Sequence, residues 1–229
     1  MSDIRAAANQ APIAVSENGM ASPWMTPLRS FATLPDVSAL VRAGYGFHVT
    51  VGAFSTPITG GGAGTILDQD QPEFVISVPS GSAIIPVRMS VQAQVPLLAT
   101  DADETEILIA VDRTAAFDAS GTYTAETVFN MRTDNPVASV CTVGSAFTAN
   151  MTNPTLGIEL ARAVITGDVQ GTAATALWTP LALNYEPANA PVIVGPAMVI
   201  GYWGGTVATT GFAQLQWVEL PSALSAVFS

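Results

Sequence analysis

Acidic side chains are the residues of this sequence whose spacing comes closest to that of a binding site. Four carboxylates fall within six positions, at Asp101, Asp103, Glu104 and Glu106. Ca²⁺ takes about six to eight oxygen ligands, so this cluster is a weak candidate calcium site. It lacks the glycine and the distal glutamate that an EF-hand loop requires. The simpler interpretation is a solvated hairpin loop, and we expect no bound metal and no other cofactor.

A second acidic group consists of Asp68, Asp70 and Glu73. The same two interpretations apply to it, and a surface loop is again the simpler one. A cation shared by the two groups would require both loops to meet at one end of the fold. The sequence does not show such a meeting.

Nucleophilic and covalent catalysis have few candidate residues here. His48 is the single histidine, Cys141 is the single cysteine, and there is no lysine. A triad needs a base, an orienting acid and an activated nucleophile, and no Gly-x-Ser-x-Gly elbow is present. We therefore interpret His48 as a structural or surface residue and Cys141 as a small core residue. We therefore expect that the chain is not an enzyme, although a glycoside hydrolase that uses two paired carboxylates remains an alternative.

The composition limits the classes of partner. Charged residues make up only 11% of the 229 residues and hydrophobic residues 49%, whereas an ordinary domain is about 25% charged. Either neutral polar side chains cover the surface, or much of the surface is buried against other chains. The net charge is −11 with seven arginines, so strong nucleic-acid binding through phosphate contacts is not expected.

The first 46 residues differ from the rest of the chain. Prolines recur there at short intervals, and three acids balance three arginines, so residues 47–229 carry the whole net charge. Dense proline favours extended backbone, although a short helical turn is expected near 35–42. We predict an extended arm over residues 1–46, held by intermolecular contacts through Ile13, Trp24 and Phe31, and a folded body over residues 47–229.

The body has the pattern of an all-β fold. Short alternating apolar stretches are separated by Gly, Pro, Asn and Asp turns, which favours an antiparallel sandwich or barrel. Pro86, inside one stretch, marks an edge or a bulge. An uncharged stretch over 187–218 is broken by Pro and Gly, so we expect strands there and no membrane span. The expected strands cover residues 47–53, 73–78, 83–95, 104–112, 122–130, 137–143, 158–166, 176–185, 197–203 and 212–220.

Two parts of this pattern resemble a known family. The stretch Gln71–Val91 has a strand, a Pro-Ser-Gly turn and a second strand, and Val194–Trp203 followed by Phe212–Leu220 reads as a pair of closing strands. Over residues 70–220 the chain resembles single jelly-roll coat proteins of bacteriophages. The resemblance implies a jelly-roll β-sandwich in a virion shell, made in the host cytoplasm, with no catalytic residues to carry over. The acidic body departs from coat proteins whose inner face is basic.

We therefore expect a structural virion protein that assembles with copies of itself, as trimers or larger units of an icosahedral shell, and with other virion proteins. Its place as a major capsid, minor capsid or decoration protein stays open. The alternative is a carbohydrate-binding or adhesin-type β-sandwich of a tail fibre or a cell surface. Light scattering and glycan binding would separate the two interpretations.

Overall fold

The computed structural model describes residues 36–60, 67–97, 103–113, 122–134, 137–148, 151–152, 154–167, 177–205 and 209–220. In chain order, its elements are α1 (Asp36–Leu40), η1 (Val41–Tyr45), β1 (Gly46–Val51), β2 (Ile58–Thr59), β3 (Phe74–Val78), β4 (Ala83–Leu97), β5 (Asp103–Asp112), β6 (Thr124–Glu126), β7 (Phe129–Asn130), β8 (Thr142–Ser145), β9 (Leu156–Gly167), β10 (Leu177–Tyr185), β11 (Ile193–Val194), β12 (Ala197–Gly205) and β13 (Thr210–Leu220).

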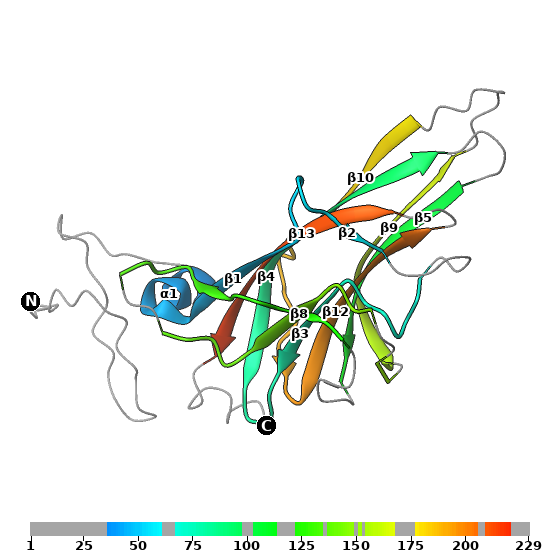
Figure 1. The fold of residues 1–229 in the computed structure, drawn as a ribbon. Helices are drawn as coiled ribbons and strands as arrows, with labels where there is room; N and C mark the ends of the chain where they lie inside the picture. The colour runs from blue at the N-terminus through cyan, green and yellow to red at the C-terminus, as the bar shows by residue number, and fades with distance from the viewer. Residues whose placement is uncertain are drawn as a thin grey trace, which may run out of the picture.

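The strands form two antiparallel sheets (Figure 1). The seven-stranded sheet has the order β10-β4-β13-β1-β7, with β11 beside β4 and β2 beside β13. The six-stranded sheet has the order β6-β8-β3-β12-β5-β9. The chain passes repeatedly from one sheet to the other, and the last strand, β13, lies between β1 and β4. This order is that of a jelly roll, so the predicted all-β, jelly-roll β-sandwich is confirmed.

An insertion between β5 and β9 enlarges both sheets on one side of the sandwich. Its strand β7 pairs with β1, whereas β8 pairs with β3 and β6 pairs with β8. The sequence predicts one strand over 122–130, but the structure has β6 and β7 there, in different sheets. It also predicts a strand over 137–143, but β8 begins only at Thr142. The alternating residues of these stretches fit a strand, and alternation does not show where a chain crosses between sheets.

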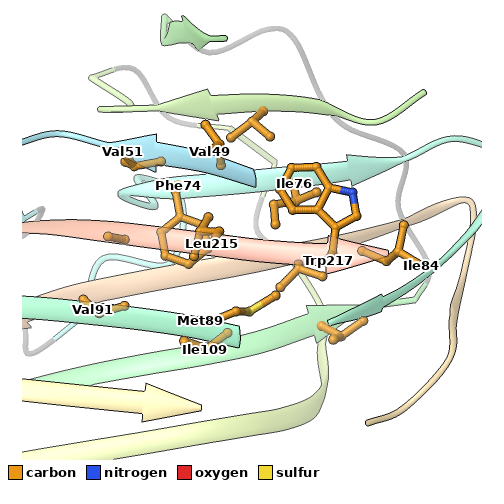
Figure 2. Close-up of a cluster of buried hydrophobic side chains, with 14 of the residues drawn as sticks. Val49, Val51, Phe74, Ile76, Ile84, Met89, Val91, Ile109, Leu215 and Trp217 are labelled. Atoms are coloured by element: carbon orange, nitrogen blue, oxygen red, sulfur yellow. The ribbon is translucent and has the colours of Figure 1, made fainter. Parts of the chain in front are cut away.

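The main core lies between the two sheets. Alternate residues of each strand point inward, as period-two side-chain geometry requires. Figure 2 shows part of this cluster, with residues from both sheets, among them Phe74, Met89, Ile109, Leu215 and Trp217. A smaller cluster covers the opposite face of the six-stranded sheet, where Phe147 and Met151 of the insertion pack near Tyr202.

Pro86 lies in an interior strand and not at a sheet edge. β4 pairs with β13 from Ala83 to Gln94, and the register shifts between Gln216 and Trp217, opposite Pro86. On the other side, β11 pairs with Ile84 and β10 pairs from Met89 onward. Proline lacks the N–H that a strand partner would accept. The predicted bulge is therefore confirmed, and it places Pro86 where β4 changes partners.

The helical segment packs against the end of the sandwich. η1 contacts β1 and β13, and Asn130 Nδ2 donates a hydrogen bond to the Gly44 carbonyl at 2.7 Å. The helical turn expected near 35–42 is present as α1 and the start of η1. Neither of these helices, in the ranges described, has the length and apolar character that crossing a membrane requires. Residues 1–35 of the predicted arm, with Ile13, Trp24 and Phe31, lie outside the described residues, and the arm's boundary at 46 stays a prediction.

Gly201 of β12 lets the ring of Phe74, its partner on the neighbouring strand β3 of the same sheet, lie across its backbone. A Cβ atom at this position would lie 1.9 Å from Cε1 and 2.1 Å from Cζ of Phe74. Phe74 is fully buried, with its ring beside that of Trp203, so it has no space into which to move. The packing of this ring on a bare backbone therefore requires glycine.

We predict that Gly201→Ala lowers the free energy of unfolding by about 2 kcal/mol, because overpacking a filled core costs roughly 1–3 kcal/mol. Gly157→Ala on β9 is the matched control, since its added Cβ would come no closer than 3.5 Å to its nearest neighbour. Urea denaturation followed by fluorescence measures both variants. Equal stability of the two variants would contradict the close approach at Gly201.

Candidate functional site

His48 lies on the outer face of the seven-stranded sheet and not in a catalytic arrangement. Its ring stacks on Phe129, with centroids 5.6 Å apart. It lines a shallow hollow of about 230 Å³ together with Thr50, Gln214 and Gln216. The hydroxyl of Thr50 and the amides of Gln214 and Gln216 donate and accept hydrogen bonds and carry no formal charge. The hollow therefore suits a neutral polar ligand, and its lining contains no carboxylate that could orient the imidazole.

The acidic cluster at 101–106 is extended and not a loop over its described part. The expected hairpin loop is wrong for Asp103, which begins β5, whereas Glu104 and Glu106 belong to β5 as the predicted strand 104–112 has them. Asp101 lies outside the described residues. Glu104 is exposed, whereas Glu106 is buried and forms an ion pair with Arg162 of β9. Within the described ranges, no three acidic, histidine or cysteine side chains come together in a way that would hold a metal ion.

The second acidic group separates into two parts. Asp68 and Asp70 are neighbours, and their mutual hydrogen bond, followed by partial burial and charge repulsion, raises the pKa of Asp68. Glu73 is buried and accepts a hydrogen bond from the Trp203 backbone N–H at 2.8 Å. It does so just beyond the last pair between β3 and β12, Phe74 with Gly201. The Glu73 side chain therefore takes the place of the next backbone acceptor in the hydrogen-bond ladder between β3 and β12.

A third buried carboxylate, Glu219, holds the chain that precedes β8. It accepts hydrogen bonds from the Ser139 hydroxyl, from the Val140 N–H at 3.0 Å and from the Trp217 indole N–H at 3.2 Å. The Cys141 N–H points to the same carboxylate at 3.4 Å. Glu219 is only 6% exposed. Sequence reasoning missed this role because it depends on contacts between segments about 80 residues apart.

A groove opens next to this contact, between β6, β8 and the chain before β8. Its volume is about 410 Å³, within the range of roughly 300–1,000 Å³ of ligand pockets. Its polar residues include Glu126, which accepts a hydrogen bond from the Ser145 hydroxyl. Most of its wall is apolar and is formed by Tyr123, Ala125, Val128, Ala138, Cys141 and Val143.

Exposed apolar side chains lie beside residues of this groove. Phe129 is 54% exposed, Val140 53% and Val137 45%, and each is next in sequence to a lining residue. Asn130 Nδ2 donates to the Val137 carbonyl at 3.1 Å, which holds β7 close to residue 137. The sequence predicts these residues in alternating strands, and alternation alone gives no signal that they remain uncovered.

The two sheets differ sharply in charge. Among the described residues, the strands of the seven-stranded sheet contain one arginine, Arg88, and one acid, the buried Glu219. The outer face of that sheet carries neutral polar side chains, including Thr50, Gln92 and Gln214. The strands of the six-stranded sheet contain one arginine, Arg162, and six acids: Asp103, Glu104, Glu106, Asp112, Glu126 and Glu159.

Comparison with known proteins adds no family assignment. No protein-family model, no curated protein and no solved structure matches the chain. The strand order therefore carries the assignment of the fold.

We predict that the Cys141 thiol resists alkylation and disulfide exchange at pH 8 in the folded protein. Burial, with a smaller effect of nearby Glu219, raises the pKa of this thiol far above its ordinary value, and the thiolate is the reactive form. The measurement is the rate of reaction with a chromogenic disulfide reagent, with the guanidinium-unfolded chain as control. Fast stoichiometric reaction of the folded chain would show that residues 137–141 open readily.

We predict that Glu219→Gln lowers the free energy of unfolding by about 1–3 kcal/mol, because the amide nitrogen would face hydrogen-bond donors. Glu186→Gln is the control, since Glu186 makes an exposed ion pair with Arg88 and such pairs contribute about 0–1 kcal/mol. Thermal unfolding and urea titration measure both. A neutral effect at Glu219 would contradict its role as an acceptor for the chain before β8.

Proposed function

We propose that this chain is a structural virion protein, a self-assembling jelly-roll capsid component of a bacteriophage. Jelly rolls are found in capsid proteins, but also in lectins and cupins, so the fold alone does not decide the function. The observation that carries the proposal is the neutral outer face of the seven-stranded sheet, in a chain that is otherwise strongly acidic. Such a face lets copies meet without bringing their carboxylates together.

A contact surface without carboxylates favours assembly for an electrostatic reason. At a contact, like charges a few ångströms apart repel by about 1 kcal/mol in water and by more when water is excluded. On the six-stranded sheet Glu104 is exposed, and Arg162 is shared between Glu106 and Glu159, so a net negative charge remains. The outer residues of β4 and β13 are mainly Gln, Ser and Thr, and the charge of Arg88 is paired with that of Glu186. Contacts through the neutral face, supplemented by exposed apolar side chains such as Phe129, avoid this repulsion. In this proposal the partners are further copies, as trimers or larger units of a shell, and other virion proteins.

An added charge on the neutral face tests the proposal. We expect the wild-type chain to form large closed particles by light scattering and negative-stain imaging. In the double variant Gln92→Glu, Gln214→Glu, we expect each new like-charge contact to cost about 1 kcal/mol, so the assembled fraction falls and moderate salt restores it. Thr124→Glu is the control, because Thr124 is exposed on the acidic sheet.

Two outcomes of this experiment would contradict the proposal. A wild-type chain that stays monomeric over the whole range of protein and salt concentration would show that the protein does not assemble with itself. Equal loss of particles in the double variant and in Thr124→Glu would show that the neutral face is not the contact surface.

The hollow beside His48 supports a second candidate, a carbohydrate-binding sandwich. Its lining of Thr50, Gln214 and Gln216 offers neutral donors and acceptors that match sugar hydroxyls, and the exposed Phe129 ring stacks on His48 at its edge. Glycan binding by a monomeric chain, abolished by Gln214→Ala, would favour this candidate. Particles that form normally and bind no glycan would leave the capsid proposal in place.

A further inference from the structure

The groove between β6 and β8 has a wall and a rim that fit apolar side chains. Its lining is mainly apolar, and Val137, Val140 and Phe129 stand exposed next to it. Solvent-exposed apolar side chains gathered around a hollow are typical of a docking site. The charged residue among the lining is Glu126.

The start of the described chain lies beside the same region. Arg132 donates a hydrogen bond to the Arg42 carbonyl at 3.2 Å, and Asn130 donates to the Gly44 carbonyl at 2.7 Å. α1 and η1 each have five residues, so they span about 15 Å at most. Residue 36 therefore lies within about 15 Å of the turn that follows β7, the strand that contains the exposed Phe129. Figure 1 shows α1 at the same end of the sandwich as the start of β1.

The preceding 35 residues contain side chains that match the groove. The sequence from Trp24 to Phe31 has an aromatic residue at each end and Arg29 between them, opposite in charge to Glu126. Phe31 is five residues before Asp36, so an extended chain brings it up to about 18 Å from α1, and Trp24 reaches about 40 Å. Asn130 Nδ2 bonds both the Gly44 carbonyl and the Val137 carbonyl, and residue 36 is at most about 15 Å of helix from Gly44, so chains of these lengths reach the groove of the same chain.

We propose that residues 24–31 bind in the groove of their own chain, with Trp24 or Phe31 covering the apolar wall beside Val140. The short connection through α1 gives the segment a high effective concentration at this groove, on the order of millimolar for short flexible linkers. The segment of a neighbouring copy would compete only if the concentration of the protein itself exceeded this effective concentration. This inference does not depend on the proposed function, because it concerns the single chain in dilute solution.

Disulfide trapping in the full-length chain tests the binding. Phe31→Cys is combined with Val140→Cys, at the rim of the groove, in a Cys141→Ser background. The matched control combines Phe31→Cys with Val164→Cys on β9 in the same background, because Val164 is 55% and Val140 53% exposed. Mild oxidation at low protein concentration is followed by mass spectrometry and non-reducing gels. We expect an intramolecular disulfide in the Val140 pair that forms at least about tenfold faster than in the control.

Three results would overturn the proposal. Equal rates in the two pairs would show that the segment has no preferred position. Disulfide-linked dimers in place of the intramolecular product would assign the groove to the segment of another copy. Amide exchange gives an independent readout in the wild-type background: Trp24→Ala with Phe31→Ala should raise exchange in residues 123–128 and 138–143, and Ile13→Ala should not. Unchanged exchange in these residues would also reject the binding.

Discussion

Backbone N–H groups at the ends of strands need acceptors, and in this protein buried carboxylates provide several of them. Glu73 accepts from the Trp203 N–H, Asp112 accepts from the Thr155 N–H at 2.7 Å, and Glu219 accepts from the chain before β8. A buried N–H without an acceptor costs about 1–3 kcal/mol, and a charged acceptor makes a stronger hydrogen bond than a neutral one. The positions of these carboxylates therefore determine where pairing can stop and the chain can leave a sheet.

The insertion between β5 and β9 depends on this arrangement. Asp112 holds its end through Thr155, and Glu219 holds its middle through Val140, so it can enlarge both sheets without long strands of its own. The groove is a result of the same anchoring, because the chain before β8 lies against the end of β13 and not along β6. With so few charged residues in the chain, the acids used for this purpose are not available to cover the surface.

Much of the sandwich could be predicted from the sequence, and the surfaces could not. Alternation and turn residues located the long strands, and Pro86 correctly indicated a bulge, because these features are local. The division of 122–130 between two sheets and the hydrogen bonds of Glu219 are contacts between distant segments, so no local pattern contains them. The acidic cluster at 101–106 was interpreted as a hairpin loop, although the predicted strand 104–112 already contained Glu104 and Glu106. The ion pair of Glu106 with Arg162 on the next strand is a contact between distant segments and had no local signal.

The unequal charge of the two sheets has a geometric consequence for a layer in which neighbouring copies make their contacts on the side of the seven-stranded sheet. In such a layer, exposed acids of the six-stranded sheet such as Glu104 would repel those of the next copy, whereas the neutral outer residues of β4 and β13 would not. Repulsion confined to one side of a layer is relieved when the layer bends away from that side. Subunits in such a layer would splay apart at the six-stranded sheet, so the layer would curve with its acidic side convex, and salt would flatten it by screening the repulsion.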